Sequence, residues 1–293
     1  MKARCVLQAQ AGLAEGPHWW AEKGVLLWVD IEASRVGLFD PVTGRNRFLV
    51  VPSHVGAVVP MSDGELLVAT AQGFVRLHPD SGVVSSLHDP EHDQPGNRFN
   101  DGKCDPWGRF WAGSMAYDFA AGAGSLWRVN ADFSCVRQRQ GLTISNGLAW
   151  SQDRGTLYLI DSPTRQVLAF PLTPSGDLSG EATPCITIPE AWDALPDGMC
   201  IDEEGMLWIA LFGGGAVTRW DPVSGLLLER LELPCRQVTS CCFGGPNLDQ
   251  LFVTTARQEM DAAAIKAEPL AGGLFQADVG VNGLPADGFQ VVV

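Results

Sequence analysis

The feature that most constrains the fold is a short apolar run that recurs about every 40 to 50 residues along the chain. Each copy is rich in aromatic and β-branched residues and follows a Gly or Asp turn, which favours a strand over a helix. The six copies are residues 26–29, 66–69, 110–113, 157–160, 207–210 and 251–254. Units of this length that repeat are typical of the blades of a β-propeller.

Each apolar run is followed by a segment of alternating polarity, as at residues 35–39 and 216–220. Loops rich in Asp, Pro and Gly, such as residues 40–44 and 221–225, then indicate hairpins that lead into a fourth strand. We therefore predict an all-β, six-bladed β-propeller with four-stranded blades, formed as a single domain by residues 1–293. Either chain end, residues 4–8 or 289–293, provides a strand that can close the last blade. Only residues 261–267 are expected to form a turn or two of helix.

Charge and cysteine content narrow the class of protein. The 34 acidic and 20 basic residues give a formal net charge of -14, which argues against nucleic acid and anionic membranes as partners. No apolar run approaches the ~20 residues of a membrane span, and the N-terminus does not resemble a signal peptide, so we expect a cytoplasmic protein. The eight cysteines lack CxxC spacing and are expected to be reduced core thiols. The sequence is compatible with a monomer or a weak oligomer.

A second repeated feature is a residue followed by Gly at the start of the first strand in five predicted blades, with the neighbourhood of Ser240 at the corresponding place in the sixth. Equivalent positions of repeated units face the same place in the assembled fold, and in a propeller that place is the mouth of the central channel. Blade by blade these residues are Glu15, Val55, Asp101, Asn146, Asp197 and the neighbourhood of Ser240. Crowded carboxylates repel one another unless a proton or a metal ion intervenes. An all-oxygen set suits Ca²⁺, Mg²⁺ or Mn²⁺, and it also accommodates zinc or Fe(II).

Single members of this pattern have simpler interpretations. An Asp or Asn before Gly is often only a turn residue, whereas Glu15 has no local hydrogen-bonding habit to explain its position. Asp202 precedes Gly205 in a predicted hairpin, so we expect it to be solvated. Two roles stay open for Asp161: it supports a ligand from outside the coordination shell, or it is simply a polar residue at the end of a strand.

Four motifs carry a family resemblance that runs nearly end to end. Asn-Arg-Phe-Asn-Asp-Gly-Lys at residues 97–103 is followed by Ile-Ser-Asn-Gly at 144–147, Pro-Asp-Gly-Met at 196–199 and Thr-Ser-Cys-Cys-Phe-Gly-Gly at 239–245. In this order and spacing they resemble the regucalcin/gluconolactonase/luciferin-regenerating enzyme family. The resemblance implies a six-bladed propeller that holds one divalent metal cation in its channel and hydrolyses sugar lactones. It also implies that Glu15, Asn146 and Asp197 are the metal ligands.

The same resemblance implies substrate-binding roles for Arg98, Asn100 and Asp118. Here the chain departs from the animal regucalcin pattern, which has Glu-Glu where this sequence has Tyr117-Asp118. The shorter Asp118 carboxylate and the bulk of Tyr117 lead us to expect a preference for a particular small aldonolactone, of pentose or hexose size, which shifts when Asp118 is replaced by Glu. Metal polarisation of a lactone carbonyl would activate it toward water, with Asp197 as the expected general base.

Other functions remain alternatives at this stage. The chain lacks HExxH and GxSxG motifs, which argues against zincin and α/β-hydrolase chemistry. A calcium-binding regulatory protein would keep the metal ligands while tolerating loss of Arg98 or Asn100. A metal-dependent phosphotriesterase or other esterase on the same fold is the other enzymatic alternative. A propeller that serves only as an interaction scaffold would have no need of Glu15, Asn146 and Asp197 together.

Overall fold

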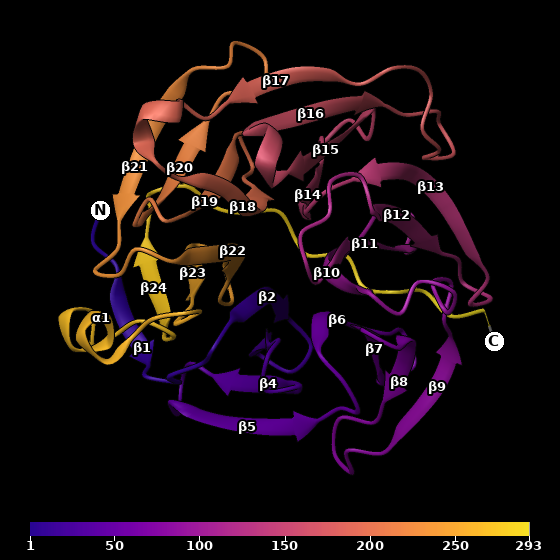
Figure 1. Ribbon diagram of the computed structural model, residues 1–293, viewed down its shortest axis with the longest axis horizontal. Helices are drawn as coiled ribbons and strands as arrows, with labels where there is room; N and C mark the ends of the chain where they lie inside the picture. The colour runs from indigo at the N-terminus through magenta and orange to yellow at the C-terminus, as the bar shows by residue number, and fades with distance from the viewer. Residues whose placement is uncertain (293) are drawn as a thin grey trace.

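The computed structural model, which describes residues 1–292, consists of six four-stranded antiparallel sheets set around a central axis (Figure 1). Successive stretches of the chain form successive sheets, as the blades of a propeller do. The predicted all-β, six-bladed β-propeller with four-stranded blades is therefore confirmed.

The first three blades comprise β2 (Ala14–Trp20), β3 (Val25–Asp30), β4 (Arg35–Asp40) and β5 (Arg45–Val50); β6 (Val55–Pro60), β7 (Leu66–Thr70), β8 (Gly73–Leu77) and β9 (Val84–His88); and β10 (Asn97–Cys104), β11 (Phe110–Ala116), β12 (Gly124–Val129) and β13 (Cys135–Leu142). The next two comprise β14 (Ser145–Trp150), β15 (Thr156–Asp161), β16 (Gln166–Pro171) and β17 (Thr183–Thr187); and β18 (Leu195–Ile201), β19 (Leu207–Phe212), β20 (Ala216–Trp220) and β21 (Leu227–Glu232). The sixth is made of β22 (Val238–Gly244), β23 (Gln250–Thr255), β24 (Leu274–Asp278) and β1 (Arg4–Leu7).

The apolar runs of the sequence are the second strands of the blades. Every residue of β7 and of β11 is buried, because neighbouring blades cover both faces of these strands. The outermost strands, such as β13, have mostly exposed or half-buried residues, which accounts for their polar composition. The repeat therefore reflects how deeply each strand lies in its blade.

The N-terminal strand closes the ring. β1 pairs antiparallel with β24 and completes the sixth blade, so residues 4–8 rather than 289–293 provide the closing strand. Residues 279–292 instead cross the centre of the ring, shown in yellow in Figure 1. This C-terminal segment pairs through Gly283 with Asp202 and through Phe289 with Met61, and the Phe289 side chain is fully buried. Residue 293 lies outside the described part of the chain.

Helical structure is confined to short segments. As predicted, residues 261–267 form one short helix, α1 (Ala262–Ala267), whose N-cap Asp261 accepts a hydrogen bond from the Ala264 N–H at 2.8 Å. Two 3-10 turns are η1 (Ser162–Thr164) and η2 (Glu190–Trp192). In residues 1–292 no helix has the length and hydrophobicity that crossing a membrane requires.

The expectation that Asp202 is solvated was wrong. Its side chain is fully buried and accepts hydrogen bonds from the Trp208 indole N–H at 2.9 Å and from Arg219 Nε at 2.8 Å. Asp105 accepts from the Trp111 indole in the same way. In both hairpins the Asp lies six residues before the Trp, so a Trp at this spacing signals a buried carboxylate rather than a solvated one.

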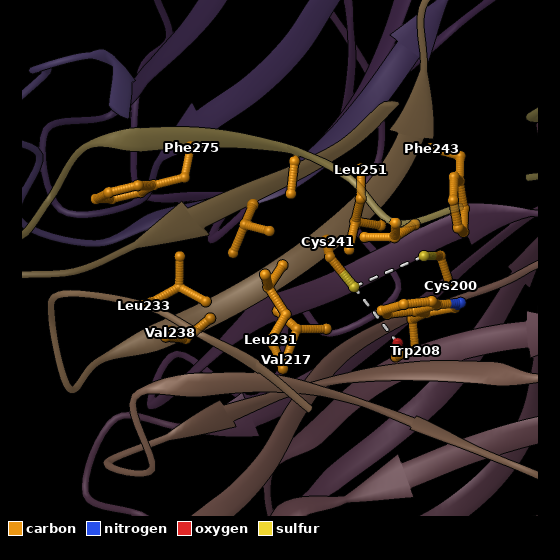
Figure 2. Close-up of a cluster of buried hydrophobic side chains, with 14 of the residues drawn as sticks. Cys200, Trp208, Val217, Leu231, Leu233, Val238, Cys241, Phe243, Leu251 and Phe275 are labelled. Atoms are coloured by element: carbon orange, nitrogen blue, oxygen red, sulfur yellow. Dashed lines mark hydrogen bonds between the residues drawn. The ribbon is translucent and has the colours of Figure 1, made fainter. Parts of the chain in front are cut away.

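Packing between the fifth and sixth blades is shown in Figure 2, where side chains of both blades interdigitate. The Trp208 and Phe243 rings meet edge to face with centroids 6.0 Å apart. The Cys200 and Cys241 sulfur atoms lie 3.6 Å apart, and all eight cysteines are free thiols. Burial raises the pKa of the Cys241 thiol well above its usual value, so this thiol is unsuited to act as a nucleophile.

Candidate metal centre and substrate cavity

Each innermost strand shifts its register against the second strand at, or directly next to, the position that the sequence repeat marks. The shifts lie between Glu15 and His18, Val55 and Ala57, Phe99 and Asp101, Ser145 and Leu148, Pro196 and Met199, and Val238 and Ser240. A bulge of this kind leaves a residue unpaired and re-aims its side chain. The repeated sequence feature therefore corresponds to a repeated irregularity of the inner strands.

The glycines of these bulges are required by the closeness of neighbouring blades. A Cβ at Gly147 would lie 2.8 Å from the carbonyl oxygen of Asp197, and one at Gly56 would lie 2.5 Å from that of Phe99. Gly16 also has a φ of +51°, which disfavours other residues. Because glycine lets the inner strands approach so closely, the residues that precede it converge at one end of the channel.

Five of the six predicted site residues line one cavity of about 250 Å³: Glu15, Arg98, Asn100, Asn146 and Asp197. All five are between 5% and 8% exposed. Much of the remaining wall is apolar and includes Leu13, Met115, Phe119, Ile144, Leu195 and Phe212. The cavity thus combines a cluster of buried polar groups with an apolar wall, as small-molecule sites commonly do.

The carboxylates of the cluster repel one another. Burial raises the pKa of Glu15 well above its usual range, and the nearby carboxylates of Asp197 and Asp101 raise it further. Burial likewise raises the pKa of Asp197, followed by the Asp101 carboxylate, while the Arg98 guanidinium acts in the opposite direction. The site therefore favours binding of a proton or a cation.

A hydrogen-bonded chain joins the neutral and cationic members of the cluster. Arg98 donates to Asn100 Oδ1 at 2.7 Å, and Asn100 Nδ2 donates to Asn146 Oδ1 at 3.2 Å. Asn146 Nδ2 in turn donates to the Ser162 hydroxyl at 2.9 Å. These contacts link β10, β14 and η1 across adjacent blades.

Asp118 is placed differently from the other predicted residues. It is exposed, and its carboxylate accepts a hydrogen bond from the Ala120 N–H at 3.1 Å within its own loop. Its neighbour Phe119 lines the cavity instead, with a φ of +58°. Tyr117 lies at 3.0 Å from His54 Nδ1 through its hydroxyl. A substrate-binding role for Asp118 stays a prediction, and Phe119 is the residue of this loop that reaches the cavity.

Sequence reasoning missed several residues of the cavity wall. Ser162 lies in η1, and Gln258 and Glu259 lie in the loop after β23. None of them belongs to the residue-Gly pattern, because they are brought in by turns outside the innermost strands. Asp161 has a structural role, since its carboxylate accepts hydrogen bonds from the Thr143 and Ile144 N–H groups.

A second cavity of about 350 Å³ lies at the opposite ends of the innermost strands, next to residues 284–287 of the C-terminal segment. It is lined by His18, Lys103 and Cys200 among others. Burial, with a smaller effect of Lys103, lowers the pKa of His18 to about 3, so this imidazole is neutral at pH 7. Lys103 donates to the Met199 carbonyl at 2.7 Å. None of the predicted site residues lines this second cavity.

Comparison with known proteins agrees with this architecture. Residues 13–257 match the family model described as "SMP-30/Gluconolactonase/LRE-like region". A Bacillus subtilis protein named "Putative sugar lactone lactonase YvrE" is 39% identical over 281 residues, which cover 95% of this chain and 96% of that protein. Regucalcin of Xenopus laevis is 36% identical over 295 residues, covering 99% and 98%.

Solved structures show the same relationship. The crystal structure of a calcium-binding protein, regucalcin, from Agrobacterium tumefaciens superposes with a TM-score of 0.94 at 30% identity, covering 99% of this chain and 97% of that one. A luciferin-regenerating enzyme superposes with a TM-score of 0.91 at 31% identity, covering 97% of each chain. The fold, the motifs and these matches together show that the chain belongs to the SMP-30/gluconolactonase/LRE-like family.

Proposed function

We propose that this protein is a hydrolase of carboxylic esters that opens a sugar lactone to the aldonic acid, with a divalent cation held by Glu15, Asn146 and Asp197. The observation that carries the proposal is the convergence of these three side chains, with Arg98 and Asn100, in one buried cavity. Relatives of this chain include a protein named for sugar lactone lactonase activity and several regucalcins. A cavity of about 250 Å³ suits a ligand of monosaccharide size.

The residues fit a hard divalent cation. Two buried carboxylates and one amide oxygen form an all-oxygen set, and burial together with like charges raises the pKa of Glu15 and Asp197. Within residues 1–292 no group of three or more His, Cys, Asp and Glu residues is arranged to hold a metal ion. The site therefore depends on the Asn146 amide as its third protein ligand, and oxygen donors favour Ca²⁺, Mg²⁺ or Mn²⁺ over softer metals.

In the proposed reaction a water molecule attacks the lactone carbonyl carbon, and the bond from that carbon to the ring oxygen breaks. When bound, the cation supplies positive charge that polarises the carbonyl. Asp197 accepts the proton of the attacking water as the general base. The same proton then passes to the departing ring oxygen, which leaves as the hydroxyl of the aldonic acid.

Arg98 and Asn100 position the substrate in this proposal. One terminal nitrogen of Arg98 is held by Asn100 Oδ1 and by the Phe99 carbonyl, which fixes the plane of the guanidinium. Its other N–H groups are then oriented donors for sugar hydroxyls. Because Arg98 is 8% exposed, such hydrogen bonds would form in a desolvated site, where they discriminate strongly between substrates.

The apolar wall favours one alternative, a metal-dependent phosphotriesterase or other esterase with an apolar substituent on its substrate. Phe119, Ile144 and Phe212 offer no hydrogen-bond partners for additional sugar hydroxyls. A calcium-binding regulatory role without catalysis would also use the same ligands.

A substrate panel separates these functions. The metal-stripped protein is assayed by proton release with pentonolactones, hexonolactones, aryl esters and phosphotriesters, while Ca²⁺, Mg²⁺, Mn²⁺, Zn²⁺ and Fe²⁺ are returned one at a time. We expect hydrolysis of an aldonolactone that depends on one of these cations. Faster turnover of aryl esters or phosphotriesters would favour the alternative enzyme, and tight Ca²⁺ binding without turnover of any substrate would favour a regulatory protein.

A further inference from the structure

We propose that Ser162 is a positioning residue of this site, whose hydroxyl sets which end of the Asn146 amide faces the cation. The inference rests on the proposed function in taking Asn146 as a cation ligand. Asn146 presents an oxygen at one end of its amide and an N–H group at the other, and only the oxygen can bind a cation. The site therefore needs a device that fixes the orientation of this amide.

One end of that device is a group that only donates. Arg98 carries no acceptor, so the atom of Asn100 that lies 2.7 Å from it must be the amide oxygen. The opposite end of the Asn100 amide donates to the Ser145 carbonyl at 2.9 Å, and a carbonyl only accepts. The orientation of the Asn100 amide is thus fixed from both sides, and its N–H group points to Asn146. The acceptor on Asn146 must therefore be its amide oxygen.

The other end is a group that only accepts. The Ser162 hydroxyl donates its single proton to the Pro196 carbonyl at 2.7 Å. Its oxygen can then only accept from Asn146, whose Nδ2 lies 2.9 Å away. The hydrogen bonds run in one direction from the guanidinium of Arg98 to the carbonyl of Pro196, and no proton in this chain is free to reverse.

A reversed Asn146 amide would break two of these hydrogen bonds. Its N–H group would oppose the N–H group of Asn100, and its oxygen would face a hydroxyl whose proton is already used. The exposed fractions of Asn100, Asn146 and Ser162 are 7%, 5% and 4%, so bulk water does not readily replace the lost partners. The amide oxygen has two lone pairs, of which Asn100 uses one, and the other stays available for a cation.

Ser162 also joins the two blades that carry these ligands. It begins η1, directly after β15 of the fourth blade, whereas Pro196 immediately precedes Asp197 in β18 of the fifth. One hydroxyl therefore bonds both the side chain of one proposed ligand and the backbone next to another. Removing a group that hydrogen-bonds to a metal ligand from outside the coordination shell typically lowers metal affinity by about 10- to 100-fold.

The experiment is a calorimetric titration of the metal-stripped, full-length protein with Ca²⁺. We expect Ser162→Ala to raise the Kd for Ca²⁺ by about 10-fold or more. Thr164→Val is the matched control, because it removes a hydroxyl from the same turn whose partners lie outside the proposed site: it donates to the Asp161 carbonyl at 2.7 Å and accepts from the Gln166 N–H at 3.3 Å. This control should bind Ca²⁺ with the parent affinity. Ser162→Cys, which keeps the shape of the side chain with a weakly hydrogen-bonding thiol, should change the Kd in the same direction and serves if the alanine variant does not fold.

A double-mutant cycle distinguishes an orienting role from a purely structural one. Asn146→Asp places an oxygen at both ends of the side chain, so orientation no longer matters. In that background Ser162→Ala should change the Kd by no more than about 2-fold, the usual limit of additivity. An equal factor in both backgrounds would show that Ser162 only holds the turn in place, and would overturn the inference.

The outcomes also separate this inference from the proposed function. If the parent protein binds none of the divalent cations, the proposed function and with it the assignment of Asn146 fail. If the parent binds Ca²⁺ and both Ser162 variants bind it equally well, the proposed function stands and the role of Ser162 is refuted.

Discussion

Replacement of Glu15 by Gln should have opposite effects on stability with and without a cation. Gln has the shape of Glu, and its oxygen can still accept the hydrogen bond that the Gly16 N–H donates to Glu15 at 2.8 Å. The substitution removes one buried negative charge beside Asp197 and Asp101. In the metal-free protein this relieves repulsion, so Glu15→Gln should melt at a higher temperature than the parent at pH 8.

The pH dependence of this effect follows from the direction of the pKa shift. Burial and the neighbouring carboxylates raise the pKa of Glu15 in the folded state above its unfolded value. Between these two values the folded protein holds more protons than the unfolded chain, so the stability of the metal-free parent falls as the pH rises through this window. Glu15→Gln should reduce that fall, and its advantage should shrink toward pH 4.

With cation the order should reverse. A ligand at 100 times its Kd stabilises the folded state by about 2.7 kcal/mol. For 293 residues at about 2.1 cal/mol/K each, the entropy of unfolding is about 0.6 kcal/mol/K, so the parent should gain about 4 °C. The Gln variant should gain much less at the same Ca²⁺ concentration, because it lacks an anionic ligand.

The measurement is differential scanning calorimetry of both proteins at pH 5 and pH 8, with chelator and with Ca²⁺. A metal-free variant that melts below the parent at pH 8 would refute the picture of mutually repelling carboxylates. A variant that gains as much from Ca²⁺ as the parent would remove Glu15 from the cation site.

Three further substitutions test other parts of the molecule. Arg98→Ala should lower kcat/KM for the best lactone by at least about 100-fold. It should bind Ca²⁺ as tightly as the parent or more tightly, because a positive charge next to the carboxylates is lost while the Ser145 carbonyl still fixes the Asn100 amide; weaker Ca²⁺ binding in a titration would contradict this. Phe119→Ala should change the ratio of kcat/KM between pentonolactones and hexonolactones more than Asp118→Glu does, because Phe119 lines the cavity. A larger change for Asp118→Glu would show that Asp118 determines the sugar preference. Asp202→Ala should destabilise the protein by about 3 kcal/mol in urea unfolding, because the Trp208 indole and the Met206 N–H lose their buried acceptor, although Arg219 keeps its salt bridges to Glu204 and Glu229; a loss below about 1 kcal/mol would show that these donors find other partners.

The blade repeat was readable from the sequence because burial follows strand depth. The second strands are covered on both faces, so their apolar runs are continuous and easy to recognise. The residue-Gly pattern was readable for a related reason, since close inner strands admit only glycine at positions such as Gly147. Family motifs added which of the converging residues were candidates for ligands, namely Glu15, Asn146 and Asp197.

Local composition was misleading where the partners of a side chain lie on neighbouring strands, or where the backbone turns in a way that composition does not indicate. Asp202 has the composition of a solvated hairpin, yet Arg219 and Trp208 reach it from neighbouring strands and make it part of the core. The loop after β11 gave no sign that Phe119 rather than Asp118 would face the cavity, because a left-handed φ at Phe119 turns the chain there.

The number of blades, the apolar strands and the ring of residues that precede glycine can be predicted from the chain alone, since each of these depends on a short-range pattern that repeats. The chain end that closes the ring and the hydroxyl that orients Asn146 become known only from the three-dimensional fold. Both depend on single contacts between distant segments, β1 with β24 and Ser162 with Pro196. Such contacts occur once in the molecule, so no repeat in the chain records them.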